Sequence, residues 1–271
     1  METNKNRIDN DKYYTPIEIA NRCWQVVDEL FDVDTFSEIV EPSCGEGAFF
    51  HYRRVPDIGI DIRPELGGGN IVTADWLEYD IPYKKGRLVI GNPPFGSRMY
   101  MAQSFFRKAV KVADVVAFIL PISQLGNTHS LCEFDLIKSV DIGKMPFSGR
   151  TLHCCFNVYS RPKNGMLNKR PVSRLKSVKI VRNDSRSYPD APYDFRMCAW
   201  GDGTAGKVIP EGETYSAEYK IKVSDTLPYR DEVLEYIKNY DWKGTMKAIA
   251  MRKIQQFHII DIIKKKFPDI D

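Results

Sequence analysis

The 271-residue sequence lacks three features that would assign it to a class at once. It has no apolar run long enough to span a bilayer, and its polar N-terminus has no signal-peptide pattern. We therefore expect a cytoplasmic protein without a membrane partner. Its six cysteines show no Cys-x-x-Cys pair and no histidine at metal-ligand spacing, so we expect reduced thiols and no metal.

Neither sign of charge dominates, with 39 Lys and Arg against 36 Asp and Glu, but the two signs are unevenly distributed. Residues 151–271 carry 22 basic against 15 acidic residues, and nine of these basic residues lie within residues 161–186. Residues 172–181 alternate apolar and polar side chains, which predicts a half-exposed strand. Clustered cations attract a phosphate backbone, although a solvated basic loop is the alternative. We predict DNA contacts from Lys169, Arg170, Arg174, Lys176, Lys179 and Arg182.

The most specific motif is Asn92-Pro93-Pro94-Phe95, which follows the apolar run of residues 88–91. The run predicts a buried strand, and two adjacent prolines make the following turn stiff because they fix φ. The turn brings together an amide oxygen, a proline carbonyl and an aromatic ring. This set suits a flat molecule with an amino group, since the two oxygens accept its N–H hydrogens while Phe95 stacks on its ring.

Three earlier segments each predict a strand that ends in polar residues. Residues 39–50 predict a strand, a loop and a helix, and glycines at 45 and 47 let the loop approach a ligand closely. Residues 58–62 and 71–77 predict strands that end in Asp61 and Asp75, each of which could singly be a solvated carboxylate. Before them, Thr15 and Pro16 predict a helix start, with Glu18 completing a capping box.

Taken together and in this order, these segments resemble S-adenosylmethionine-dependent amino-methyltransferases. The position of the cofactor segments before the Asn-Pro-Pro-Phe motif resembles the γ group of N6-adenine DNA methyltransferases. The resemblance implies a doubly wound, Rossmann-like α/β sheet over residues 1–160. It implies that Asp61 binds the cofactor ribose and Asp75 its adenine amino group. The implied catalytic residues are Asn92, Pro93, Pro94 and Phe95, and the implied cofactor-binding residues are Thr15, Pro16, Glu41, Pro42, Ser43, Cys44, Gly45, Gly47, Asp61, Asp75, Trp76 and Asn92.

Later segments complete this domain. Residues 102–113 predict a helix, residues 115–121 a buried strand, and residues 145–159 a hairpin arm at the edge of the sheet. In the family, an aromatic residue before the final strand can stack on the target base, and Phe147 is the match. The alternative is that Phe147 is a core residue.

We assign residues 161–271 to a small basic α+β segment for target recognition, which resembles no family. It is expected to contain a strand at residues 215–223 and helices at residues 229–240 and 244–267. Pro189-Asp190 and Glu218-Tyr219-Lys220 are similar to a Mg²⁺-dependent nuclease pattern. Such short patterns often arise by chance, so we expect no nuclease.

The predicted reaction is methyl transfer from S-adenosylmethionine to N6 of an adenine flipped out of DNA, where Phe95 and Phe147 replace its stacking partners. The alternatives are methylation of an RNA adenine, methylation of a protein glutamine amide, or a non-catalytic cofactor-binding subunit. DNA is the predicted partner, and a separate restriction endonuclease is a candidate partner.

Overall fold

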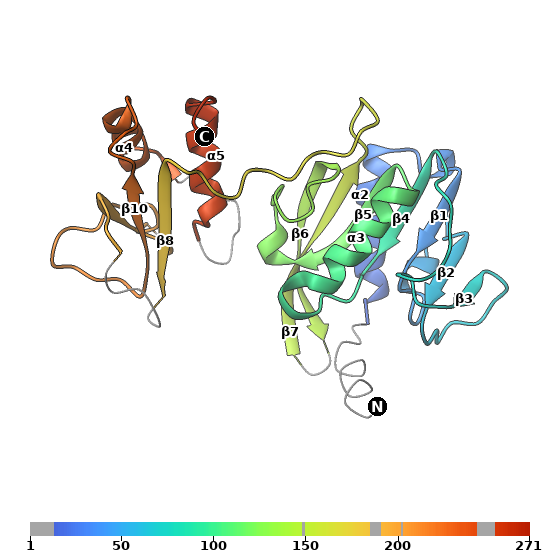
Figure 1. The fold of residues 1–271 in the computed structure, drawn as a ribbon. Helices are drawn as coiled ribbons and strands as arrows, with labels where there is room; N and C mark the ends of the chain where they lie inside the picture. Colours follow the sequence, from blue (N-terminus) through green and yellow to red (C-terminus); the bar gives the residue numbers. More distant parts are fainter. Residues whose placement is uncertain (1–13, 148–149, 185–190, 202, 243–252) are drawn as a thin grey trace, which may run out of the picture. The chain divides into compact units, whose positions relative to one another are not determined.

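The computed structural model describes residues 14–147, 150–184, 191–201, 203–242 and 253–271. The chain forms two compact units, Met1–Arg170 and Pro171–Asp271 (Figure 1). Residues 161–170, which we assigned to the second part, therefore lie in the first unit. Arg161 explains part of this difference, because its guanidinium donates to Asp114 Oδ1 at 2.9 Å and to the Val110 carbonyl at 2.7 Å.

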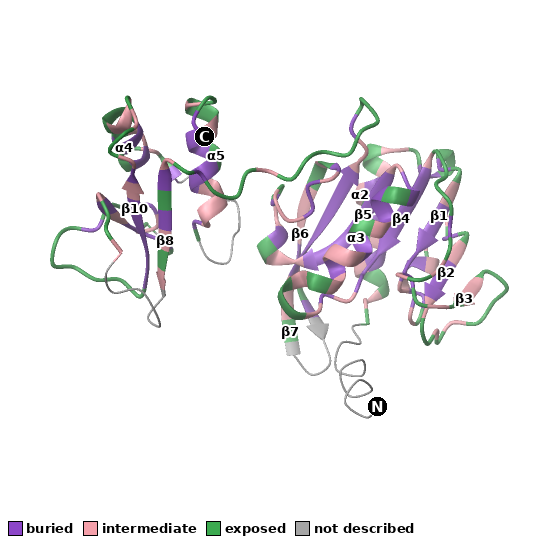
Figure 2. Ribbon diagram, in the orientation of Figure 1, coloured by how far each residue is buried: buried purple, intermediate pink, exposed green. Residues whose placement is uncertain are grey.

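A seven-stranded sheet forms the first unit, in the order β3-β2-β1-β4-β5-β7-β6. The first five strands are parallel, whereas β7 is antiparallel to both β5 and β6. The strands β4 and β5 are buried almost throughout, as Figure 2 shows. The predicted doubly wound α/β class is therefore confirmed. The strand bounds are β1 (Glu38–Glu41), β2 (Ile58–Asp61), β3 (Ile71–Thr73), β4 (Arg87–Gly91), β5 (Val115–Pro121), β6 (Asp135–Phe147) and β7 (Arg150–Ser160).

Two α-helices are described in this unit, and they cover opposite faces of the sheet (Figure 1). The helix α2 (Ile17–Leu30) buries Ala20, Cys23, Trp24 and Val27, which recur at helical spacing on one side. The helix α3 (Tyr100–Val112), predicted over residues 102–113, buries Phe105, Phe106, Ala109 and Val110 at helical spacing. Short 3₁₀ turns connect other elements, namely η1 (Val33–Thr35), η2 (Ala48–Phe50), η3 (Ser97–Met99) and η4 (Ile122–Gln124).

Two local predictions in this unit were wrong. The loop after β1 is followed by the single 3₁₀ turn η2 and not by a helix. The N-cap of α2 is Pro16, with no side-chain cap bond, so Thr15 and Glu18 form no capping box. The Thr15 hydroxyl instead accepts a hydrogen bond from Asn92 Nδ2 at 3.1 Å, and this tertiary contact takes the place of the local one.

The second unit contains a three-stranded antiparallel sheet in the order β8-β10-β9, with bounds β8 (Val178–Asp184), β9 (Phe195–Cys198) and β10 (Ala217–Val223). The helices α4 (Arg230–Lys238) and α5 (Gln256–Lys266) contribute apolar side chains to a core shared with this sheet. The predicted strand at 215–223 and helix at 229–240 are confirmed within two residues. The helix predicted at 244–267 corresponds to α5 in its later part, and residues 243–252 lie outside the described residues.

Candidate cofactor and substrate site

A cavity of about 590 Å³ lies at the carboxyl ends of β1, β2, β3 and β4, next to the point where the strand order reverses between β1 and β4. Ligands of doubly wound sheets bind at such a switch point, and this volume is in the range of small-molecule sites. The cavity is lined by residues Tyr14, Pro42, Ser43, Gly45, Asp61, Ile62, Arg63, Glu65, Ala74, Asp75, Trp76, Asn92, Pro94, Gly96, Ser97, Tyr100, Met101 and Phe105.

The loop after β1 is fixed by bonds to two neighbouring segments. The Gly45 N–H donates to Asp61 Oδ2 at 3.0 Å, and the Ser43 hydroxyl donates to the Asn92 carbonyl at 3.1 Å. Gly47 has a left-handed φ of 83°, and a Cβ there would lie 2.5 Å from Leu66 Cδ2. A side chain at position 47 would therefore both strain the backbone and displace Leu66.

The two predicted acids at strand ends both reach the cavity. Asp61 accepts from the Gly45 N–H and from the Arg63 N–H, the latter at 2.8 Å, so its carboxylate is held in place by backbone donors. Asp75 is exposed and accepts from the Leu77 N–H at 2.8 Å. Trp76 is 1% exposed, and its indole nitrogen donates to a carbonyl at 3.3 Å, which holds its ring against the cavity wall.

Glu41, the last residue of β1, is 2% exposed and is not among the residues that line the cavity. Burial raises the pKa of its carboxyl well above the ordinary value, and the nearby charge of Asp61 raises the pKa further. Its Oε2 atom has no hydrogen-bond partner within the described residues. A buried oxygen of this kind suits a ligand that brings a positive charge. Burial, with Glu41 and Asp61 nearby, also raises the pKa of Cys44 to about 12, so Cys44 is a neutral thiol.

Asn92 begins the turn after β4 and is 9% exposed. Its Nδ2 donates to the Thr15 hydroxyl, whereas its Oδ1 is buried and has no partner among the residues that the structure describes. The amide is therefore held by one end, and its acceptor oxygen remains for a ligand. Asn92 and Pro94 both line the cavity, so the turn borders the same space as the acids.

The cavity brings together eight of the predicted residues, which are Pro42, Ser43, Gly45, Asp61, Asp75, Trp76, Asn92 and Pro94. Thr15 reaches the site through its bond to Asn92, and Pro16, Glu41, Cys44, Gly47 and Pro93 are not in the lining. Phe95 is 6% exposed, packs in the core and is not in the cavity lining, so its stacking on a target base stays a prediction. Phe147 is the last residue of β6. Its side chain lies outside the part that the structure describes, so its stacking role stays a prediction.

Several lining residues were missed by the sequence reasoning. Tyr14 donates through its hydroxyl to Glu65 Oε1 at 2.9 Å, and this pair joins the segment before α2 to the segment after β2. Tyr100 is 67% exposed at the start of α3. Tyr14 stands beside the Thr-Pro pair, which was a usable signal, whereas nothing in the local pattern distinguishes Tyr100 from a surface residue.

The predicted DNA-binding residues are divided between the two units. Lys169 and Arg170 belong to the first unit, and the other four belong to the second. Within β8, Lys179 and Arg182 are three positions apart, so they point to opposite faces of the sheet. With residues 161–170 counted in the first unit, residues 171–271 carry 18 Lys and Arg against 15 Asp and Glu. The role of these cations in DNA binding stays a prediction.

The nuclease-like pattern gains no support from the second unit. Glu218 is 2% exposed and accepts from Arg196 and from Asn183 Nδ2. Pro189 and Asp190 lie outside the described residues. In the part of the chain that the structure describes, no three His, Cys, Asp or Glu side chains are grouped to hold a metal, and no helix is long and apolar enough to cross a membrane.

Neither a protein-family model nor a curated protein matches this chain. Among solved structures, a Pyrococcus horikoshii protein described as a candidate RNA methyltransferase is similar over 56% of this chain and 87% of its own, at 20% identity and a TM-score of 0.45. The 23S rRNA methyltransferase ErmE is similar over 56% of this chain and 70% of its own, at 15% identity and a TM-score of 0.39. The magnesium protoporphyrin IX methyltransferase ChlM of Synechocystis PCC 6803, solved with bound S-adenosylmethionine, is similar over 52% of this chain and 79% of its own, at 13% identity and a TM-score of 0.37. The first unit has a Rossmann-like, doubly wound sheet, with β7 between β5 and β6.

Proposed function

We propose that this protein transfers a methyl group from S-adenosylmethionine to an amino nitrogen, and that its target is N6 of adenine in DNA. The observation that supports this most is the buried, unpartnered Oδ1 of Asn92 at the wall of the cavity. An amino group that donates to this oxygen would satisfy it, which is the contact expected of an amino-methyltransferase.

The cavity residues fit the cofactor by their chemistry. Asp61 presents a fixed carboxylate for hydroxyl groups, Asp75 presents an exposed carboxylate for an amino group, and Trp76 supplies an apolar ring wall. Glu41 lies outside the cavity lining and has a raised carboxyl pKa, so it would become a negative partner only if the cationic methionine end reached its Oε2 atom. When bound, S-adenosylmethionine supplies a methyl group that its positive sulfur activates.

The role of the Asn92 turn is to prepare the nucleophile. An adenine amino nitrogen is a weak nucleophile because its lone pair is delocalised into the ring. When Asn92 Oδ1 and the Pro93 carbonyl accept the two N–H hydrogens of this amino group, its nitrogen becomes more tetrahedral and its lone pair is freed. Thr15 fixes the orientation of the amide before the substrate arrives, so this electrostatic arrangement is preorganised. A separate restriction endonuclease remains a candidate partner in this proposal.

The test is the Asn92→Ala variant, assayed with labelled S-adenosylmethionine on DNA, RNA and protein, followed by nucleoside or peptide analysis. Loss of one preorganised acceptor should lower methyl transfer by about a hundredfold or more, while cofactor affinity changes far less. Phe95→Ala should also lower the rate, and Phe95→Trp should lower it less because the aromatic face is kept. A folded Asn92→Ala variant that methylates at the wild-type rate would refute the assignment. Label found only in RNA or protein would replace the proposed substrate and leave the catalytic turn unchanged.

A further inference from the structure

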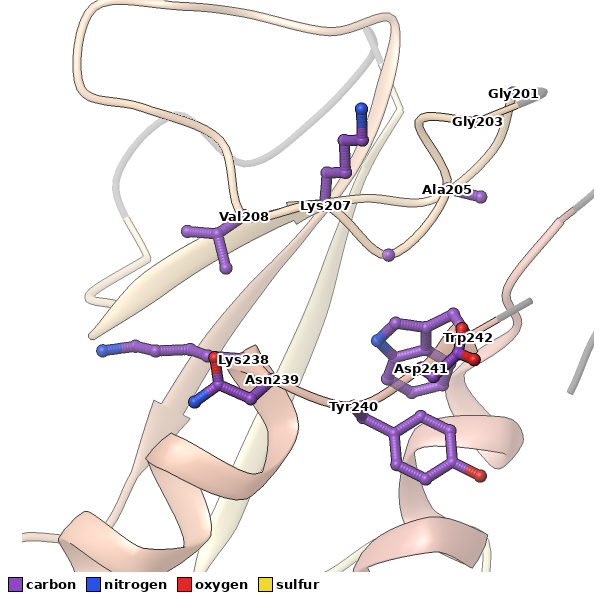
Figure 3. Close-up of a pocket in the computed structure, with 11 residues that line it drawn as sticks. Gly201, Gly203, Ala205, Lys207, Val208, Lys238, Asn239, Tyr240, Asp241 and Trp242 are labelled. Atoms are coloured by element: carbon purple, nitrogen blue, oxygen red, sulfur yellow. The ribbon is translucent and has the colours of Figure 1, made fainter. Parts of the chain in front are cut away.

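The second unit contains a cavity of about 420 Å³ that none of the reasoning above uses. It lies between the turn after β9 and the segment that follows α4 (Figure 3). Glycines at 201, 203 and 206 supply one wall, and Lys238, Asn239, Tyr240, Asp241 and Trp242 supply the other. The volume is sufficient for one small ring-containing molecule.

Trp242 is the central residue of this cavity. Its side chain is 4% exposed, and its Nε1 has no hydrogen-bond acceptor among the described residues. Figure 3 shows the indole nitrogen facing the space between Val208 and Asn239. Buried N–H groups are almost always paired in folded proteins, so an orphaned donor that faces a cavity indicates a ligand with an acceptor atom.

The indole is held in this orientation from two sides. Gly206 has a φ of 87°, and a Cβ there would lie 2.2 Å from Trp242 Cδ1, so the turn packs directly on the ring. Tyr240 contacts the indole edge-to-face at a centroid distance of 4.9 Å. The Gly206 N–H donates to the Cys198 carbonyl at 2.8 Å, which fixes the turn to the end of β9. The donor is therefore preorganised.

The charge at the edge of the cavity narrows the class of ligand. Lys207 and Lys238 are exposed, and Figure 3 shows both ammonium groups directed away from the indole. The lining contains these two lysines against one acid, Asp241. The inner wall is apolar where Ala205, Val208 and the indole ring contribute. A ligand that fits both parts has a flat ring with acceptor atoms and an anionic group outside it.

We propose that this cavity binds one nucleotide of the nucleic acid on which the enzyme acts, a proposal that rests on the proposed function. The base enters the cavity and accepts a hydrogen bond from Trp242 Nε1 through a ring nitrogen or a carbonyl oxygen. The phosphates meet Lys207 and Lys238 at the mouth. The second unit thereby contacts a base directly and does not rely on backbone charge alone.

The experiment is ¹⁵N NMR of the indole N–H signals of the full chain, which contains four tryptophans. The Trp242→Phe variant assigns the Trp242 signal, and mixed-sequence single-stranded DNA, duplex DNA, RNA and the separate nucleoside monophosphates are the probes. We expect the Trp242 signal to move on addition of a nucleic acid, and the anisotropy-measured affinity of Trp242→Phe to fall about three- to tenfold, as for one lost hydrogen bond. The matched control is Trp200→Phe, because Trp200 Nε1 already donates to the Ser216 hydroxyl at 3.3 Å. Its affinity should stay within twofold.

The salt dependence of binding tests the mouth of the cavity. The double variant Lys207→Ala/Lys238→Ala should lower the slope of log affinity against log salt by about two, the value for two lost phosphate contacts. Lys265→Ala/Lys266→Ala removes the same charge from exposed positions at the end of α5 and should leave the slope unchanged.

Three outcomes would overturn the proposal. The first is an unmoved Trp242 signal with wild-type affinity in Trp242→Phe, which leaves methyl transfer by the Asn92 site intact. The second is a signal moved by an uncharged N-acetyl-dipeptide amide and by no nucleotide, which assigns the cavity to a peptide. The third is the absence of binding by any nucleic acid or nucleotide. If nucleotides move the signal while labelled methyl groups appear only in protein, the cavity binds a nucleotide, but the proposed substrate fails and with it the statement that this nucleotide belongs to the substrate.

Discussion

Replacement of Glu41 by Gln should separate the charge of this residue from its shape. The carboxyl is buried beside Asp61, and both burial and that neighbouring charge raise its pKa. Without cofactor, folding therefore shifts the equilibrium of the Glu41 carboxyl toward its protonated form. A cation at the orphaned Oε2 would instead favour the carboxylate, so cofactor binding should release a proton.

The magnitude follows from a single charge-assisted hydrogen bond in a buried site. We expect the affinity of Glu41→Gln for S-adenosylmethionine to fall by about tenfold to a hundredfold, which is about 1.4–2.8 kcal/mol. Wild-type affinity should rise with pH until Glu41 is ionised in the free protein, while the affinity of the variant should be flatter. The difference in cofactor affinity between the wild type and the variant should therefore grow as pH rises.

The stability of the cofactor-free protein should move in the opposite direction. The folded-state pKa of Glu41 is raised, so its contribution to stability is fully present below the ordinary value of 4.5 and is lost as pH rises through the folded-state pKa. The Glu41→Gln variant has no carboxyl to ionise at this position, so its stability does not fall in this way. We therefore expect the variant to become more stable relative to wild type as pH increases.

Titration calorimetry in buffers of different ionisation enthalpy measures both the affinity and the number of protons released. We expect about one proton for the wild type where Glu41 is protonated beforehand, and about none for Glu41→Gln. Glu46→Gln removes one charge from an exposed position of the same loop and should behave as wild type. Equal affinity and equal proton release in Glu41→Gln and wild type would refute the reasoning.

Two further variants test the other parts of the proposed function. Asp61→Ala should weaken cofactor binding by about 1–3 kcal/mol, because the variant loses both a fixed acceptor and the carboxylate that binds the Gly45 N–H. Calorimetry on the folded variant measures this affinity. An unchanged affinity would mean that the cofactor binds elsewhere. Combined replacement of Arg170, Arg174 and Lys176, which are all exposed, by Ala should weaken DNA binding across sequences and flatten its salt dependence without changing cofactor affinity. An unaltered slope of log affinity against log salt would show that these cations are solvated and do not contact DNA.

The sequence by itself determined the elements whose signals are local. The turn after β4 follows from two prolines behind an apolar run, and α3 follows from the helical spacing of its buried residues. The edge hairpin of β6 and β7 and the acids at the ends of β2 and β3 were predictable for the same reason. Parallel strands bring such carboxyl ends to one edge of the sheet, so the lining residues at these strand ends were predictable, whereas Tyr100 was not.

Only the tertiary structure decided which partners the polar groups take. Thr15 has a strong local signal as a helix cap, yet it bonds Asn92, which is 77 residues away. Lys179 and Arg182 belong to one basic run, but the two-residue period of β8 places them on opposite faces. The orphaned donor of Trp242 depends on how the turn at Gly206 packs on its ring. Side-chain partners are set by contacts between distant segments, and neither propensity nor periodicity contains that information.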